Sequence, residues 1–313
     1  MGTEAAAAEG KAKPRSLDQQ RKRLGLYMTL PAQLLLLFIV AFPLVMQLYV
    51  SLTFWSPLDG EDWYYAYKSF TWFYNYIDLV TNERLWDAIG RTVLIMAVVV
   101  PVEFLIGFGL ATLFVDSFPG KRIFYSILIM PMMIVPAVAG YMFFMIFQSN
   151  GPLNQILGID TVWLGSPNLA MIAVMVADIW QWTPLMFLIL LAGILGVPED
   201  QLKAATLLGA SWGQKFVRIV LPRMKTVIII ALVIRAVESF KLFDLMFIMT
   251  KGGPGVATET ISVWIFKLTF NDLDWSYVAA IGISILIALS VFAVIGLTVM
   301  AKANKRMNAD VVD

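Results

Sequence analysis

Seven charged side chains stand inside the long apolar runs of this sequence, where burying a charge is costly. They are Arg91, Glu103, Asp178, Arg235, Glu238, Lys241 and Asp244. A charge near the middle of a bilayer costs at least about 2.5–3.5 kcal/mol unless it is paired or hydrated, so such residues mark ion pairs or polar pathways. Carboxyl groups can also transfer protons, so a catalytic cluster within the membrane is a second chemistry open to them.

Four of these charged residues follow a regular spacing. Arg235, Glu238, Lys241 and Asp244 alternate in sign at intervals of three. Neighbours at this spacing can pair along a helix, although successive members drift around it by about 60° and cover half of its circumference. Two interpretations stay open. Either Arg235 pairs with Glu238 inside a bundle while Lys241 and Asp244 reach water, or this face lines a water-filled path.

The residue types that are missing narrow the chemistry further. The chain has neither cysteine nor histidine, which removes thiolate nucleophiles, disulfides and the commonest acid–base and metal-binding side chain. A net charge of +1 argues against a nucleic-acid partner. Gly120-Lys121 is followed by Arg122 and lacks a glycine five positions earlier, so it is not a Walker A loop. We therefore expect no catalytic residue, no metal site and no cofactor in this chain.

The overall composition indicates a membrane protein. The 313 residues are 59% hydrophobic and only 14% charged, against about 25% charged in soluble domains. Six apolar runs are long enough to cross a bilayer, and prolines such as Pro131 and Pro136 mark kinks or helix starts. The runs are 27–50, 88–115, 123–147, 169–194, 225–249 and 277–300. Because backbone groups in lipid must be bonded internally, the sequence predicts an all-α integral membrane protein with six transmembrane helices.

The distribution of lysine and arginine predicts the orientation of these spans. Sixteen of them lie in the two terminal tails, in the loop 116–122 and in the segment 198–225, whereas the loops on the other side hold four. Basic residues favour the cytoplasmic side, so both termini and the loop between the fourth and fifth spans are expected there. We expect a disordered tail at 1–24, a six-span domain at 25–303 and a short tail at 304–313 in a multi-pass protein of the inner, cytoplasmic membrane.

The cytoplasmic segment 198–222 is too polar to cross a membrane and too apolar to be a simple connection. Pro198 and the acids after it suit the start of a helix, Gly209 breaks that helix, and Ser211 suits the N-cap of a second one. The second helix carries an apolar stripe and is expected to end at Pro222. Such a pair of short helices either joins two spans at the membrane surface or fits a groove on a partner.

Two motifs carry a resemblance to a known family. The segment 198–222 resembles the EAA loop of binding-protein-dependent ABC transporter permeases, with Ala204, Ala205, Gly209, Ile219, Leu221 and Pro222 in register. The segment 243–260, FDLMFIMTKGGPGVATET, resembles a pattern of the maltose-type carbohydrate-uptake permeases. The resemblance covers residues 25–303. It departs from the family at Lys203, where a glutamate is usual, and at Leu208, where an aspartate is usual.

The resemblance implies a non-catalytic permease subunit of an ATP-driven importer for a carbohydrate delivered by an extracytoplasmic solute-binding protein. It also implies a second permease chain and two cytoplasmic ATPases, which would hold ATP and magnesium. Contact with the ATPases is assigned to Lys203, Ala204, Ala205, Gly209, Ala210, Ser211 and Phe216. If the charged face lines the path, Glu238 and Asp244 accept hydrogen bonds from sugar hydroxyls. Trp180, Gln181 and Trp182 could supply a stacking surface.

Two other functions remain open at this point. One is a membrane-embedded enzyme or assembly protein whose cytoplasmic helices recruit a partner, which a catalytic cluster within the spans would favour. The other is a self-sufficient secondary transporter, against which the lack of an evident internal repeat in the six spans argues.

Overall fold

The computed structural model describes residues 17–309, which fold almost entirely as helices; residues 1–16 of the expected tail lie outside this range. The α-helices are α1 (Leu17–Ser51), α2 (Tyr74–Thr81), α3 (Glu83–Leu113), α4 (Lys121–Met133), α5 (Pro136–Ile146), α6 (Pro152–Leu157), α7 (Pro167–Leu195), α8 (Glu199–Leu207), α9 (Trp212–Lys215), α10 (Leu221–Phe240), α11 (Asp244–Thr250), α12 (Ile261–Phe270) and α13 (Trp275–Ala309). The all-α class is confirmed for the described residues. Residues 17–24, expected in the disordered tail, are the first turns of α1.

Four of the described helices are long and apolar enough to cross a membrane: Leu24–Ser51 of α1, α3, α7, and Trp275–Gly296 of α13. The expected span 123–147 differs from a single helix, because α4 and α5 meet at 97°. Val135 is extended, with a ψ of 132°, since the ring of Pro136 disfavours helical geometry in the residue before it. If this bent pair crosses as one unit, it is a fifth candidate span.

The expected span 225–249 is divided into α10 and α11 at residues 241–243. It is not among the candidate spans of the described chain, so the sixth span stays a prediction. The expectation that Pro222 ends the second cytoplasmic helix is wrong. A π-helical turn at Phe216–Val220 joins α9 to α10, and the N–H of Leu221 donates to the carbonyl of Phe216. Pro222 then falls in the first turn of α10, directly after the π turn, and both features are common causes of a bend in a continuous helix.

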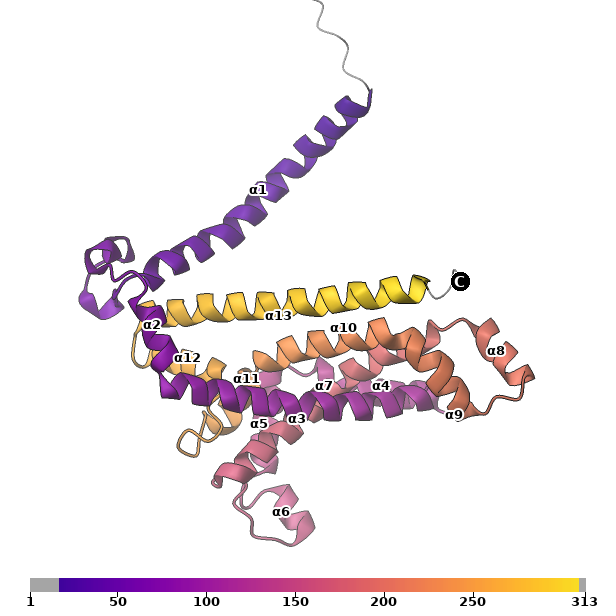
Figure 1. Ribbon diagram of the computed structural model, residues 1–313. Helices are drawn as coiled ribbons and strands as arrows, with labels where there is room; N and C mark the ends of the chain where they lie inside the picture. Colours follow the sequence, from indigo (N-terminus) through magenta and orange to yellow (C-terminus); the bar gives the residue numbers. More distant parts are fainter. Residues whose placement is uncertain (1–16, 310–313) are drawn as a thin grey trace, which may run out of the picture.

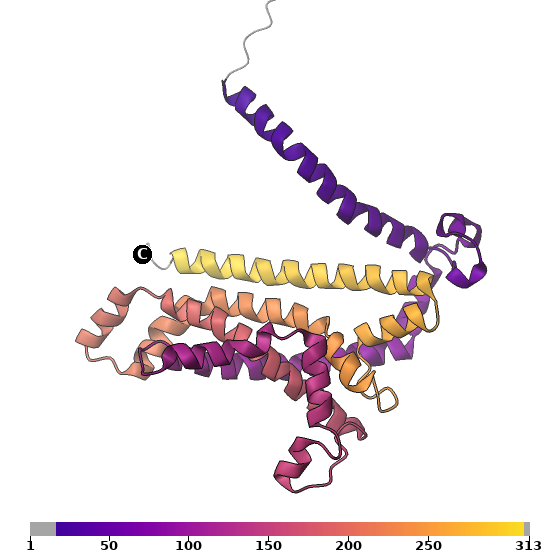
Figure 2. The same cartoon turned by 180° about the vertical axis from the view of Figure 1, so that it is seen from behind.

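Helices α3, α7, α10 and α13 run alongside one another and form the body of the molecule (Figure 1). Helices α8 and α9 lie at the end of this body where α13 finishes, and α2 and α12 lie at the opposite end, as both views agree (Figure 2). Helix α1 diverges from the body, and only 6% of its apolar window is buried. Helices α8 and α9 and the end of α13 are thus at one end of the bundle.

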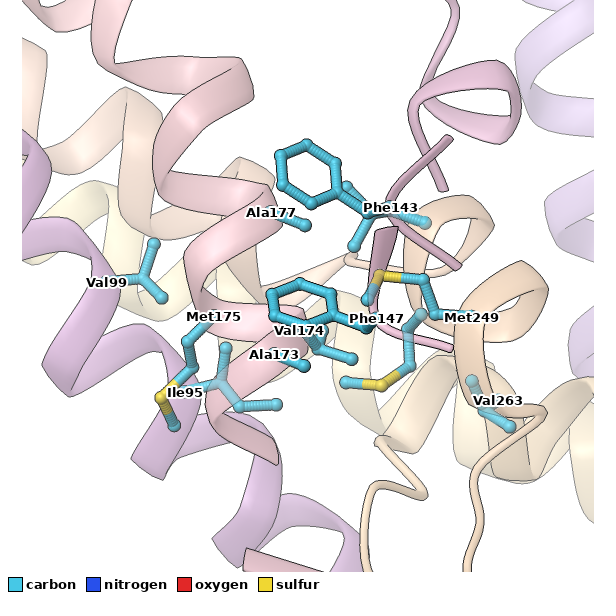
Figure 3. Packing of buried hydrophobic residues seen from close by; sticks show 12 residues of the cluster. Ile95, Val99, Phe143, Phe147, Ala173, Val174, Met175, Ala177, Met249 and Val263 are labelled. Atoms are coloured by element: carbon cyan, nitrogen blue, oxygen red, sulfur yellow. The ribbon is translucent and has the colours of Figure 1, made fainter. Parts of the chain in front are cut away.

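The core that positions the polar groups is built from several helices. Figure 3 shows side chains of α3, α5, α7 and α12 meeting around Val174 and Phe147. Helices α3 and α7 approach closely at Gly107, where an added Cβ would lie 2.9 Å from the Cβ of Met186. This close contact fixes α3 against α7 and leaves no room for a larger side chain at that level.

Candidate functional site

The segment between α7 and α10 forms an elbow that we define as residues 199–216. Its first helix, α8, is followed by Gly209, which has a left-handed φ of 78°. The N–H of Ala210 donates to the carbonyl of Ala205 at 2.9 Å, and that of Gly209 donates to the carbonyl of Thr206 at 3.0 Å. This hydrogen-bond pattern ends a helix and favours glycine at the left-handed position. An added Cβ at Gly209 would meet nothing within 4 Å, so its surroundings are open.

The second helix of the elbow begins as the sequence predicts. The hydroxyl of Ser211 accepts from the N–H of Gln214 at 3.3 Å, and the side-chain oxygen of Gln214 accepts from the N–H of Ser211 at 2.9 Å. This reciprocal capping fixes the first turn. Phe216 stacks on Trp212 at 5.0 Å between ring centroids and lies 5.4 Å from the ring of Phe108 in α3. Phe216 therefore anchors the elbow to the bundle.

The outer surface of the elbow combines charge with exposed apolar side chains. Lys203 pairs with Glu199 at 2.8 Å, and this ammonium holds the pKa of Glu199 below its usual range. Leu207 is 90% exposed and Leu208 is 88% exposed. Ala204 lies on the exposed surface and Ala205 is half-buried. Adjacent leucines with so large an exposed fraction are typical of a surface that a partner covers.

A polar cavity of about 160 Å³ lies between α7, α10 and the start of α11. Its lining includes Gln181, Trp182, Glu238 and Asp244, so four of the five residues expected along a path share one cavity. Trp180 is not among the lining residues. Its ring lies 5.2 Å from that of Phe143 in the apolar core.

A buried ion cluster flanks this cavity. Arg235 donates from Nε to Glu103 at 2.5 Å and from Nη2 to the other oxygen of Glu103 at 2.8 Å. Arg235 also donates from Nη2 to Oδ2 of Asp178. All three side chains are essentially inaccessible to solvent, and the guanidinium lies 5.4 Å from the ring centroid of Trp182. The cluster ties together α3, α7 and α10.

One of the two interpretations of the charged face, in which Arg235 forms an ion pair with Glu238, is wrong. Glu238 instead pairs with Lys241 at 2.8 Å, and about half of each side chain is exposed. Both residues line the cavity, but a step of three residues rotates a side chain by about 60° around the helix, and the guanidinium of Arg235 is turned toward Glu103 of α3 and Asp178 of α7. The two charges nearest in sequence therefore do not neutralise each other.

Gln181 holds the bend between α4 and α5. Its Nε2 donates to the carbonyl of Ile134 at 2.9 Å, and Ile134 is the first residue after α4. The amide nitrogen is committed to this carbonyl, so the amide oxygen of Gln181 points elsewhere. That oxygen and Oδ1 of Asp178 have no hydrogen-bond donor among the described residues.

The glycine-rich segment after α11 forms a compact loop at the opposite end from the elbow. The hydroxyls of Thr250 and Thr258 lie 2.7 Å apart. Glu259 is fully buried and pairs with Arg84 at 3.0 Å and Lys267 at 2.6 Å. Burial opposes ionisation of this carboxyl, but the two cations outweigh it and hold the pKa of Glu259 below its usual range. The carbonyl of Glu259 also accepts from Nε of Arg91 at 2.9 Å.

The profile of the family described as binding-protein-dependent transport system inner membrane component matches residues 103–307. This region begins at Glu103 of the ion cluster and contains both the elbow and the cavity. The chain belongs to this family.

Curated relatives extend the similarity over most of this chain. The chain is 31% identical to the trehalose/maltose transport system permease protein MalF of Thermococcus litoralis, over 90% of this chain and 95% of that protein. It is also 31% identical to the sulfoquinovosyl glycerol transport system permease protein SmoG of Agrobacterium fabrum, over 88% of this chain and 89% of that protein. The trehalose transport system permease protein SugA of Mycobacterium tuberculosis is 30% identical to this chain, over 88% of this chain and 87% of that protein.

The fold of this chain is also similar to that of a protein whose structure has been solved. A chain in the crystal structure of a bacterial alginate ABC transporter, in complex with an alginate pentasaccharide-bound periplasmic protein, superposes with a TM-score of 0.71 at 20% identity. The superposition covers 92% of this chain and 95% of that one.

Two features of the structure were not predicted from the sequence. Sequence reasoning identified Glu103, Asp178 and Arg235 as charges within spans but did not bring them together, since they are 132 and 57 positions apart. It also passed over Glu259, although this glutamate stands inside the recognised segment 243–260 and a lysine stands eight positions after it. That spacing of opposite charges was the available signal.

Proposed function

We propose that this chain is one of two permease subunits in an ATP-driven importer of carbohydrates. The observation that carries the proposal is the family match over residues 103–307, because that region includes both the elbow and the polar cavity. Relatives over most of the chain are named as permeases for trehalose, maltose and sulfoquinovosyl glycerol. The importer would also contain two ATPases, which hold ATP and magnesium, and a solute-binding protein that delivers the sugar.

The elbow is the proposed contact with an ATPase. Its exposed leucines, Leu207 and Leu208, together with Gly209, provide an apolar tip at one end of the bundle. Helix α8 contains three further residues of the proposed contact, Lys203, Ala204 and Ala205. The rest of the contact is formed by Ala210, Ser211 and Phe216. Closure of the ATPases on ATP would push on this tip and favour one arrangement of the bundle over another. The chain itself would break no bond.

The cavity beside the ion cluster is the proposed binding site for the sugar. Glu238 and Asp244 present carboxylate oxygens, which accept hydrogen bonds from hydroxyl groups. Trp182 offers an aromatic face, and Lys241 offers a donor next to Glu238. Trp180 is left out of the proposed path because its ring packs on Phe143. Gln181 also lines the cavity.

The proposed orientation places the elbow and both termini in the cytoplasm. The chain contains no cysteine, so single cysteines can report the two sides without background. Cysteine in place of Leu207, which is 90% exposed, is expected to resist a membrane-impermeant thiol reagent in intact cells. Cysteine in place of Leu58, which is 72% exposed in the loop after α1, is expected to react. Labelling from outside at residue 207 would reject both the orientation and the coupling role.

The function itself is tested by the proteins that accompany this chain. We expect purification in a mild detergent, followed by mass spectrometry, to yield two ATPase copies and a second permease. Uptake of a labelled sugar by proteoliposomes is expected to require ATP inside and the binding protein outside. Uptake by this chain alone, driven by an ion gradient, would instead support a secondary transporter. Recovery of a stable complex without an ATPase would support an assembly protein or a membrane enzyme.

A further inference from the structure

The buried ion cluster contains one more negative charge than positive charge if both of its acids are ionised. Arg235 supplies a single cation, whereas Glu103 and Asp178 supply two carboxyl groups, and all three side chains are at most 2% exposed. The other titratable groups that line the cavity are Glu238, Lys241 and Asp244. Glu238 and Lys241 pair with each other, and Asp244 adds a further acid, so none of the three supplies the cluster with a free cation. An uncompensated charge of this kind inside a bilayer is expensive. One of the two acids is therefore a candidate to carry a proton.

The hydrogen bonds distinguish the two acids. Glu103 receives two donors from the guanidinium, one on each oxygen, which is the arrangement that best stabilises an ionised carboxylate. Asp178 receives Arg235 on Oδ2 only. Its other oxygen, Oδ1, is buried and has no donor among the described residues. The geometry therefore favours Glu103 as the counter-ion of Arg235.

A second buried acceptor stands next to Asp178. Gln181 is three residues further along α7, so the two side chains share a face of that helix, and both line the cavity. The amide nitrogen of Gln181 is bound to the carbonyl of Ile134, which fixes the amide oxygen as the free end. That oxygen also lacks a donor. A buried polar group without a partner costs free energy, and two acceptors at this spacing on one face of a helix could both be satisfied by a single hydrogen between them.

We propose that Asp178 is protonated in the resting permease and donates from Oδ1 to the amide oxygen of Gln181. This one proton satisfies both acceptors and leaves the cluster neutral, with Arg235 balanced by Glu103. It also links the ion cluster to the bend between α4 and α5, because Gln181 holds that bend at Ile134. Asp178 is thus a proton-carrying positioning residue at the wall of the cavity.

The proposal predicts an asymmetry between two isosteric substitutions. Asp178→Asn supplies an amide N–H where the acid proton would be, so the unfolding temperature is expected to stay within about 3 °C of the unchanged protein. Glu103→Gln leaves Arg235 without its counter-ion and is expected to lower that temperature by about 10 °C. Thermal unfolding of the purified complex in nanodiscs measures both. Equal losses in the two variants would overturn the proposal.

Infrared spectroscopy observes the proton directly. The spectrum of the unchanged complex minus that of Asp178→Asn is expected to contain the carbonyl stretch of a protonated carboxylic acid, shifted in heavy water. Glu238→Gln is the matched control and is expected to remove only carboxylate bands, because Glu238 is half-exposed and paired with Lys241. If Asp178→Asn also removes only carboxylate bands, Asp178 is ionised and a bound water or cation supplies the missing donor. That result would reject the proposal but leave the proposed transport function standing.

Discussion

Arg235 and Glu103 meet through two parallel hydrogen bonds of 2.5 and 2.8 Å, which join the middle of α10 to α3 inside the apolar body of the protein. Removing one partner of a buried pair leaves the other charge unpaired, which costs about 3–5 kcal/mol, whereas replacing both with apolar residues is often neutral. We therefore expect Arg235→Met to lower the stability of the permease strongly, and Arg235→Met with Glu103→Met to restore most of it. Thermal unfolding measures the difference, and a double variant as unstable as the single one would contradict it.

Glu238 offers the opposite case, because its ion pair with Lys241 is exposed and lies beside the cavity. Glu238→Gln is expected to assemble normally and to lower sugar uptake at low concentration by about tenfold or more, since a hydrogen bond to a charged group contributes about 1.5–3 kcal/mol. The matched control is Glu61→Gln, which removes an ion pair of the same length and exposure with Lys68, away from the cavity. Unchanged uptake by Glu238→Gln would remove this residue from the path.

Gly209 has two possible roles that one pair of substitutions separates. Its φ of 78° favours glycine, but asparagine also tolerates this conformation. We expect Gly209→Asn to keep the turn and yet to uncouple ATP hydrolysis from uptake, because the new side chain enters the contact with the ATPase. Gly158→Asn is the control, since Gly158 has a φ of 65°, equally open surroundings and a place outside the elbow. Normal coupling in Gly209→Asn would mean that the glycine serves the turn alone.

Lys203 stands where related permeases carry a glutamate, and it pairs with Glu199 within α8. Lys203→Glu places two acids one turn apart and is expected to weaken co-purification with the ATPase. The double variant Glu199→Lys with Lys203→Glu restores the pair within the helix but reverses the charges that a partner meets. We expect it to stay weak. Full recovery of the complex by the double variant would indicate that Lys203 acts only within its own helix.

Glu259 makes the stability of the end opposite the elbow dependent on acid pH. Because the folded-state pKa of Glu259 lies below its usual range, near 4.3 for glutamate, its ion pairs contribute fully above that pH. Their contribution is lost as the pH falls through the depressed folded-state value. Glu259→Gln is expected to be less stable than the unchanged chain at pH 7 and to show a smaller further loss on acidification. Unfolding followed from pH 7 to pH 3 measures this, and identical acid profiles would refute it.

The sequence was most informative where structure depends on neighbouring residues. Gly209 and Ser211 predicted the break and the second helix start correctly, because a left-handed turn and a capping hydroxyl are local requirements. The membrane character and the bend near Pro136 likewise follow from composition and from the backbone of proline. These features need no knowledge of what packs against the segment.

The sequence was least informative where packing decides. Intervals of three suggested that Arg235 pairs with Glu238, but the rotation of α10 in the bundle turns Arg235 toward Glu103 and Asp178 instead. That rotation depends on how α3, α7 and α10 pack, including the close approach at Gly107. The division of the expected fifth span between α10 and α11 was also hidden, because neither proline nor glycine stands at residues 241–243 to mark the break.

The helical path from Trp212 through the π turn at Phe216–Val220 to Phe240 contains no loop, but it changes direction where the π turn meets α10 (Figure 1). A π turn and a proline are common causes of such a bend. Further along the same path, Arg235 is tied by its ion pairs to two other helices. If the elbow is the contact with the ATPase, the stiffness of this hinge would set how much of a displacement at the elbow reaches Glu238 and Lys241.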